Sequence, residues 1–405
     1  MLTYTYTARD TATGQKVKAE VQAESEQAAA RLIQKEGLAP LEIKAKDIEG
    51  TGFKRFFNKV KTKDRVIFAR QLSTLINAGL PLVQSLRSVL AQTKSKPLQS
   101  VINSIITDVE SGKPMSEAIT KFPKVFNQVF VSLIASGETS GTLDTALERI
   151  ANQQEKDAEI MAKVKGAMTY PAIVMLVMAG VVGFMITSVL PQVETLYDGI
   201  SGVQLPLITR VLLVISHFII DYWYIVIVLL IVLGFITSKW ARTLGGKSVV
   251  DALKMRMWPI GPLFMKLYMA RFARTATTLV STGVPLIQTL EITAKAVDNI
   301  HISKSIRKAI EKVKGGKALS ASLTGDDNFL ELVPQMLKIG EDSGAIEQML
   351  EKTADYYEKE VDNQIKSIST IIEPVLMIVL GVVALIIVGA VLLPIYGLVG
   401  KSVIK

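Results

Sequence analysis

The chain has 405 residues and a net charge of +9; 49% of its residues are hydrophobic, which is high for a soluble protein, although 20% are charged. It contains no cysteine and only two histidines, His217 and His301, so disulfide chemistry is excluded and a histidine-based metal site or catalytic triad is not expected. These proportions indicate a protein with both membrane-embedded and water-exposed parts, and we expect no cofactor. Nucleic acid is not expected as a direct partner, because the positive charge better fits the cytoplasmic side of a membrane protein.

Residues 1–46 are predicted to form a small cytoplasmic domain with the element order ββαβ. Tyr4, Tyr6 and Ala8 alternate with polar residues, as in a half-buried strand, and a helical pattern between Ser25 and Gly37 follows a second strand. Residues 1–30 contain no cationic segment followed by an apolar one, so no cleaved signal peptide is expected.

Residues 47–63 are predicted to be a basic linker. Phe53, Phe56 and Phe57 are interleaved with lysine and arginine. This segment either packs its rings on the next domain or lies on an anionic lipid leaflet.

Two segments, 64–165 and 266–370, repeat the same motifs in the same order, which predicts a duplicated cytoplasmic helical bundle. Phe68-Ala69-Arg70 returns 204 residues later as Phe272-Ala273-Arg274. The two Gly-x-Pro sequences also correspond, and we expect each glycine to end a helix and each proline to start the next one. These residues are Gly79 and Pro81 in the first copy, and Gly283 and Pro285 in the second.

The sequence Gly-Glu-x-Ser-Gly occurs at residues 137–141 and returns at 340–344. Its last glycines, Gly141 and Gly344, suit a tight turn between helices. One interpretation is purely structural, with an acid in the first turn of the next helix. The alternative is a partner-docking surface around Glu138 and Glu341. A Ca²⁺ ion held by acids near Glu138 is less favoured, because such sites need six or more oxygen ligands.

Three long uncharged runs predict transmembrane helices at 168–191, 219–238 and 374–398. Lysine and arginine gather beside one set of span ends, which places the N-terminus in the cytoplasm and the C-terminus in the periplasm. The segments between and after the spans are then a short periplasmic loop at 192–218, a cytoplasmic linker at 239–265 and a periplasmic tail at 399–405.

A proline lies near the start of the first and third runs, as Tyr170-Pro171 and Glu373-Pro374. We expect each proline in the first turn of its span, where it is tolerated. Glu373 then either stays wet at the interface or contacts a span of another subunit or a client's membrane segment.

Residues 241–248 satisfy the looser P-loop pattern A/G-x4-G-K-S. A nucleotide site needs a preceding strand and a following helix, so that backbone N–H groups surround the phosphates. Here a predicted membrane helix precedes the pattern. We therefore expect an interfacial loop and no nucleotide ligand at Lys247.

Together, the small N-terminal domain, the two Gly-x-Pro and Gly-Glu-x-Ser-Gly copies and the three spans resemble the type II secretion F / type IV pilus platform family (PilC/GspF-like). The resemblance implies a non-catalytic protein of the bacterial inner membrane. It also implies coupling of a hexameric assembly or retraction ATPase to the insertion or extraction of pilin or pseudopilin. Alignment-complex proteins, membrane lipid and further copies of the chain are implied as partners.

Two other functions stay open at this point. A transporter subunit is the alternative, although the spans show neither an interior charge nor a discontinuous helix for a midplane site. A nucleotide-hydrolysing enzyme is the third, and it would depend on the P-loop pattern.

Overall fold

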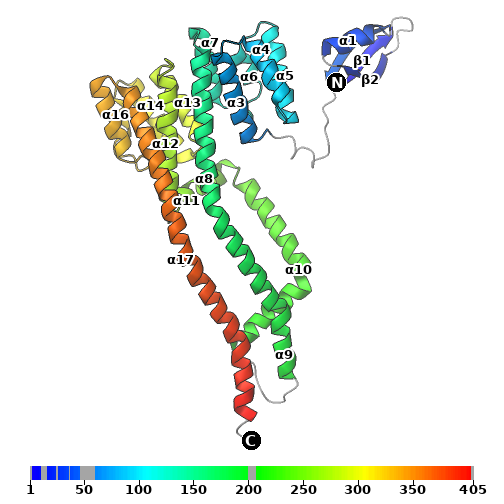
Figure 1. Cartoon of the computed structure of the whole chain (residues 1–405), viewed down its shortest axis with the longest axis vertical. Helices are drawn as coiled ribbons and strands as arrows, with labels where there is room; N and C mark the ends of the chain where they lie inside the picture. The colour runs from blue at the N-terminus through cyan, green and yellow to red at the C-terminus, as the bar shows by residue number, and fades with distance from the viewer. Residues whose placement is uncertain are drawn as a thin grey trace. The chain divides into compact units, whose positions relative to one another are not determined.

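A computed structural model describes residues 2–10, 16–23, 26–35, 37–45, 60–198 and 207–402 (Figure 1). The chain divides into two units, Met1–Lys61 with Lys94–Ser100, and Thr62–Thr93 with Val101–Lys405. The predicted linker 47–63 lies mostly outside the described residues.

The N-terminal unit has the predicted ββαβ order, which is thereby confirmed. β1 (Leu2–Asp10), β2 (Lys16–Ala23), α1 (Glu26–Lys35) and β3 (Leu38–Ala45) form a three-stranded sheet with one helix. Both neighbours of β1 are antiparallel to it, and the strand order is β2-β1-β3. Tyr6 and Ala8 of β1 pack with Ile33 of α1 to form a small core.

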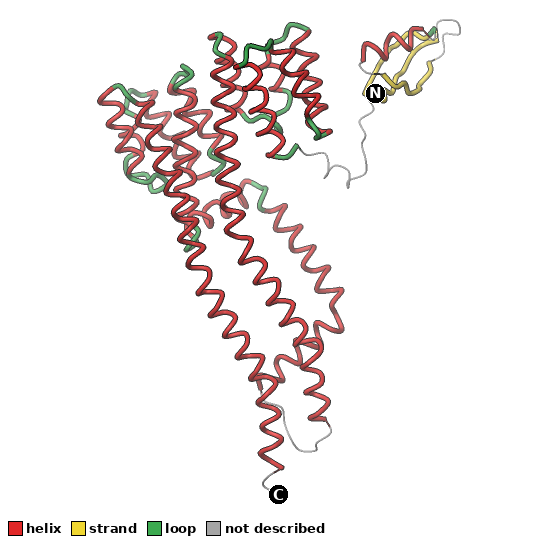
Figure 2. The backbone as a smooth tube through the Cα atoms, in the orientation of Figure 1, coloured by secondary structure: helices red, strands yellow, loops and turns green. Residues whose placement is uncertain are grey.

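Beyond the N-terminal domain, the described residues form two sets of six helices in the same order, so the predicted duplication is confirmed. Figure 2 shows the two groups of helices. The first set is α3 (Thr62–Asn77), α4 (Leu82–Gln92), α5 (Lys96–Glu110), α6 (Met115–Thr120), α7 (Gln128–Ser140) and α8 (Leu143–Phe184). The second set is α12 (Gly261–Val280), α13 (Leu286–Ala296), α14 (Ile300–Lys314), α15 (Leu319–Leu323), α16 (Leu332–Ser343) and α17 (Ile346–Ser402). We call α3–α7 with the start of α8 bundle 1, and α12–α16 with the start of α17 bundle 2.

Corresponding aromatic residues lie at the centre of each bundle. Phe68 packs on Phe126 with 5.7 Å between ring centroids, and Phe272 packs on Phe329 with 5.2 Å. Phe68 and Phe272 are almost completely buried. The first residue of each Phe-Ala-Arg sequence is therefore a core anchor of its bundle.

The Gly-x-Pro sequences end one helix and start another, as predicted. Gly79 has φ +85° and Gly283 has φ +79°, a conformation that glycine adopts without steric cost. Pro81 and Pro285 are the N-cap residues of α4 and α13.

The last helix of each set continues from its bundle into an apolar span without a break (Figure 1). α8 has 42 residues and α17 has 57. Pro171 and Pro374 lie inside these helices, so their expected place in a first helical turn is wrong. The uncharged runs begin there, but the helices begin far upstream, because each span is the extension of a bundle helix.

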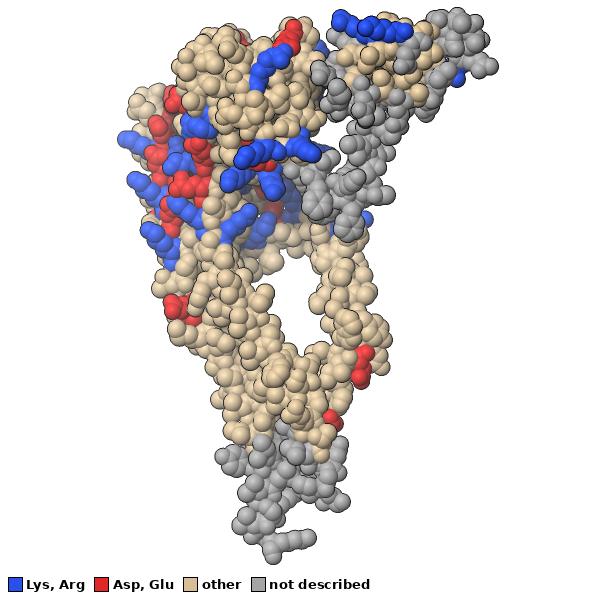
Figure 3. Space-filling model, turned by 45° about the vertical axis from the view of Figure 1, so that its right-hand side comes forward, with Lys and Arg blue, Asp and Glu red and all other residues tan. Residues whose placement is uncertain are grey.

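α8 leads into a short π-helix, η1 (Met185–Val189), and then into α9 (Leu190–Asp198). α10 (Leu207–Trp240) returns through the membrane region, and α11 (Leu244–Arg256) connects it to bundle 2. In the described part of the chain, three helices are long and apolar enough to cross a membrane, within Leu143–Gln192, Thr209–Trp240 and Ile346–Leu392. On the face that Figure 3 shows, charged side chains gather over the bundles, and the surface of the membrane region below them is almost free of charge.

The predicted periplasmic loop 192–218 is helical over much of its length. α10 begins at Leu207 and bends at Tyr222, whose φ and ψ of −118° and 22° are not helical. Leu213 packs with Leu190 and Ala390, and the Thr209 hydroxyl donates to the Ala390 carbonyl at 3.2 Å. Asp221 interrupts the uncharged run. The predicted span, 219–238, therefore covers mainly the part of α10 that follows the bend.

Candidate functional site

The two Gly-Glu-x-Ser-Gly turns have the same geometry in both bundles. A Cβ atom on Gly137 would lie 2.7 Å from the Cβ of Ala146, and one on Gly340 would lie 2.9 Å from the Cα of Ile346. The first glycine therefore lets the next helix cross closely. The last glycine ends the helix with a left-handed residue, at φ +74° for Gly141 and φ +70° for Gly344.

The glutamates of these turns cap the short helices α6 and α15. Glu138 accepts hydrogen bonds from the backbone N–H groups of Met115 at 2.5 Å and Ser116 at 3.0 Å. Glu341 accepts from Leu319 at 2.6 Å and from Ser320 at 3.2 Å, and also from the Ser320 hydroxyl. Both carboxylates are half-buried. This gives each glutamate a structural task, and a docking role for these turns stays a prediction.

The arginines of the Phe-Ala-Arg sequences bind acids on the long helices. Arg70 donates to Glu155 at 2.6 Å and to Asn152 at 2.6 Å. Arg274 donates to Glu358 at 2.8 Å and to Asp355 at 2.5 Å. These partners were not predicted from the sequence, although they correspond at the 203-residue offset of the later motifs: Glu155 to Glu358, and Asn152 to Asp355. Each pair ties the first helix of a bundle to the helix that continues into the membrane.

The two bundles pack directly on each other through α7 and α8 of bundle 1 and α12 and α13 of bundle 2. The Ser136 hydroxyl donates to the Thr282 carbonyl at 2.7 Å. The Thr278 hydroxyl donates to Gln153 at 3.4 Å, and Arg149 donates to the Ser281 hydroxyl. A polar cavity of about 280 Å³ lies in this interface, and its lining includes Arg65, Asp157 and Arg271.

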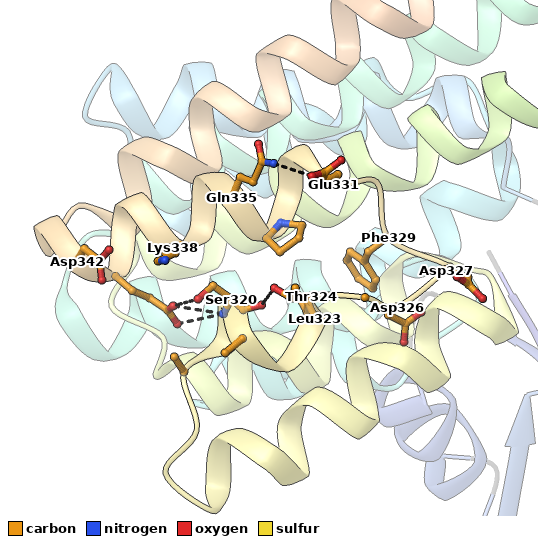
Figure 4. A pocket seen from close by; sticks show the side chains of 15 residues that line it. Ser320, Leu323, Thr324, Asp326, Asp327, Phe329, Glu331, Gln335, Lys338 and Asp342 are labelled. Carbon is orange, nitrogen blue, oxygen red and sulfur yellow. Dashed lines mark hydrogen bonds between the residues drawn. The ribbon is translucent and has the colours of Figure 1, made fainter.

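A larger groove of about 1000 Å³ lies between α15 and α16 in bundle 2 (Figure 4). The exposed acids Asp327, Glu331 and Asp342 line it, together with Lys338. The loop after α15 reads Thr-Gly-Asp-Asp-Asn at 324–328, whereas the corresponding loop of bundle 1 reads Lys-Phe-Pro-Lys-Val at 121–125. Acids therefore predominate along the groove of bundle 2, whereas the corresponding loop of bundle 1 carries Lys121 and Lys124.

The P-loop pattern does not form a phosphate-binding loop. The helix α10 precedes it, and the Thr243 hydroxyl accepts the Gly246 N–H at 3.1 Å as the N-cap of α11. Lys247 forms an ion pair with Asp298 at 2.7 Å, and this hydrogen bond raises the pKa of Lys247. The strand–loop–helix arrangement that phosphate binding needs is absent from residues 207–256.

The remaining predicted site residues lie where the bundle helices continue into the spans. Tyr170 and Glu373 are exposed on α8 and α17, beside Pro171 and Pro374.

The metal site considered in the sequence is a separate question. Within the described ranges, no three histidine, aspartate or glutamate side chains are gathered to hold a metal ion. The Glu138 carboxylate, which a Ca²⁺ site would use, faces backbone N–H groups of α6.

Comparison with known proteins shows the same duplication. A family described as Type II secretion system (T2SS), protein F matches residues 68–191 and again 272–394, and its N-terminal domain matches residues 1–44. The type IV pilus assembly protein PilC of Thermus thermophilus is 36% identical over 99% of both chains. PilC of Myxococcus xanthus is 36% identical over 96% of this chain and 94% of that protein. The type II secretion system protein F of Pseudomonas aeruginosa is 32% identical over 98% of this chain and 99% of that protein. The chain therefore belongs to the type II secretion system protein F family.

Proposed function

We propose that this protein is a non-catalytic inner-membrane platform of a type IV pilus or type II secretion machine. In this role it couples a cytoplasmic assembly ATPase to the movement of pilin or pseudopilin into or out of the fibre. The relatives named for pilus assembly and type II secretion support this proposal. The observation that carries it is the continuity of α8 and α17 from the bundles into the spans.

A continuous helix transmits a displacement better than two helices joined by a loop. Below the bundles α8 and α17 are held together by Lys163, which binds Asp362 at 2.8 Å. Ile160 of α8 packs with Val361 and Ile365 of α17 in the same region. A force that an ATPase applies to either bundle is therefore passed to both spans.

The topology proposed for this role has the N-terminus in the cytoplasm and the C-terminus in the periplasm, because cations gather near the bundle ends of the spans. Periplasmic reporters fused between Gly199 and Gln204 or after Lys405 should be active, whereas a fusion after Val250 should be inactive. An active fusion at Val250 would contradict this orientation.

Helix continuity can be tested at the junction of α8 with its span, where Met161, Lys165 and Met168 are exposed. Changing all three to glycine weakens the helix by about 1 kcal/mol per residue relative to alanine. The triple alanine variant is the matched control, since it removes the same side chains but keeps the helix. We expect the glycine variant alone to lose pilus or secretion output at normal membrane levels. Equal output from both variants would show that the coupling does not need a stiff helix.

A further inference from the structure

The contact between the two bundles joins unlike faces of the same fold. Bundle 1 contributes α7 and α8, the last two helices of its set, and bundle 2 contributes α12 and α13, the first two of its set; nearer the spans, α8 also packs on α17. Ser136 and Gln153 on the first face meet Thr282 and Thr278 on the second. In such a contact, bundle 1 uses its last-helix face and bundle 2 uses its first-helix face, so each bundle keeps its other face unused.

The corresponding last-helix face of bundle 2, on α16 and α17, is open. Ser136 corresponds to Ile339 and Gln153 to Tyr356, each at an offset of 203 residues. Ile339 is 53% exposed and Tyr356 is 48% exposed, whereas Gln153 is only 8% exposed. The two positions that pack against the other bundle in bundle 1 are thus occupied in bundle 2 by large side chains, Ile339 and Tyr356, that are in contact with solvent.

The first-helix face of bundle 1, on α3 and α4, is open in the same way. Thr278, buried at the internal contact, corresponds to Thr74, which is exposed. Arg271, which lines the cavity in the internal interface, corresponds to Ile67, which is 44% exposed. Among the described residues of the second unit, each bundle therefore has one covered face and one free face, and the two free faces are the two halves of the contact already made inside the chain.

Insertion in one bilayer fixes the orientation in which two chains could form the same contact with each other. Both bundles continue into their spans through the last helix of the set, so the two copies point toward the membrane in the same sense. A rotation about the membrane normal is the operation that relates such copies while both remain inserted. Repeating the unlike-face contact between chains places every chain upright in the same bilayer, and a closed ring leaves no free face.

We propose that the α16–α17 face of one chain, centred on Ile339 and Tyr356, docks on the α3–α4 face of a second copy, around Ile67 and Thr74. The contact repeats between chains the one that bundle 1 and bundle 2 make within a chain. This inference goes beyond the platform function and does not depend on it, because it concerns how copies of the chain meet.

The absence of cysteine from the chain makes a direct test available in the full-length protein in membranes. Ser136 corresponds to Ile339, and Thr282 corresponds to Ala78. One tagged chain therefore carries Ile339→Cys, and a second, differently tagged chain that is co-expressed with it carries Ala78→Cys. Tyr356→Cys with Thr74→Cys is the second pair. A short bismaleimide should join the two tags in both mixtures and should not join chains that all carry Ile339→Cys.

Two controls make each outcome decisive. Ser136→Cys with Thr282→Cys in one chain measures the crosslink expected at this spacing, and it should form without a change in the number of chains. Asn103→Cys on α5, outside the first-helix face, should not crosslink with Ile339→Cys. Crosslinking of Ile339→Cys with itself would show a like-face contact and overturn the proposal. The proposal would also be overturned if Ile339→Cys crosslinked as efficiently with Asn103→Cys as with Ala78→Cys. The same holds if no interchain product formed while the internal pair, Ser136→Cys with Thr282→Cys, reacted.

Discussion

Glu138 accepts the backbone N–H of Met115 at 2.5 Å, so a residue near the end of α7 caps the helix that precedes it in the chain. Glu341 accepts the N–H of Leu319 at 2.6 Å in the same way in bundle 2. The N-cap residues of these short helices, Pro114 and Ala318, form no side-chain capping hydrogen bond. The glutamates therefore supply acceptors that the local sequence lacks, and a negative charge near the positive end of the helix dipole.

The first prediction concerns this cap. Glu138→Ala should lower the free energy of unfolding by about 1–2 kcal/mol, because two backbone donors lose their acceptor. Glu138→Gln should cost less, since the amide oxygen can still accept. Chemical denaturation of the purified protein in detergent measures both changes, with Thr139→Ala at the exposed neighbouring position as the control. Equal stability of the alanine and glutamine variants would contradict a capping role.

A second prediction separates the cap from the docking role proposed for these turns. The double variant Glu138→Gln with Glu341→Gln removes both charges and keeps both acceptors. If the ATPase recognises the acids, pull-down of the ATPase and pilus or secretion output should fall while the membrane level stays normal. Normal binding and normal output would instead limit these glutamates to holding α6 and α15.

The third prediction compares the two arginine contacts. The side chains of Arg274 and Glu358 are 19% and 14% exposed, whereas those of Arg70 and Glu155 are 36% and 42% exposed. Arg274→Ala should therefore cost about 3 kcal/mol, because it leaves a mostly buried carboxylate without its partner. Arg70→Ala should cost about 1 kcal/mol or less, because solvent screens the exposed pair. Thermal unfolding of the two variants tests the order, and a larger loss from Arg70→Ala would refute this explanation.

The fourth prediction is a dependence on pH. A hydrogen bond from Lys121 at 2.5 Å, assisted by Lys113 at 3.2 Å, lowers the pKa of Asp108 below its usual value. Because the folded-state pKa is lower than the unfolded one, the interaction stabilises the protein above the unfolded value of about 3.9. The stabilisation is lost as the pH falls through the folded-state pKa.

Asp108→Asn should therefore reduce stability by about 1 kcal/mol at pH 7, and the difference from the unchanged protein should disappear as the pH falls through the folded-state pKa of Asp108. Denaturation at several pH values measures the difference. Glu110→Gln, which removes the exposed pair with Arg87, is the control and should have a smaller effect at pH 7. An Asp108→Asn deficit that persists unchanged at the lowest pH would contradict the ionic origin.

The duplication, the three spans and the ββαβ order could be predicted because each depends on local patterns. The glycines that end helices and the apolar runs are visible without knowledge of what packs against them. The acids that bind Arg70 and Arg274 could not be assigned, since many acids occur on a long solvent-exposed helix and only the fold selects Glu155 and Glu358. The helical segment that precedes the bend at Tyr222 was predicted as a loop. It is helical in the structure, where Leu213 and Thr209 contact residues far away in the sequence.

The position of Pro171 and Pro374 illustrates the same limit. Proline suits a first helical turn, and both prolines stand near the start of an apolar run, so the local pattern favoured a helix start. The bundle packing instead begins each helix more than twenty residues earlier, at Leu143 and Ile346. Tertiary contacts of the bundle thus override the local preference.

The last prediction concerns the P-loop pattern of α11. Lys247→Ala should leave pilus or secretion output unchanged and should alter stability by less than about 1 kcal/mol, because its ion pair with Asp298 is exposed. Asp251→Ala on the same helix is the contrasting variant. Asp251 is only 2% exposed and accepts the backbone N–H of Ile300 at 3.0 Å at the start of α14, so its loss should cost about 1–3 kcal/mol. Output, denaturation and the binding of a fluorescent ATP analogue by the purified protein are measured for both. Nucleotide binding that disappears with Lys247→Ala would show that the loop has a phosphate-binding function after all.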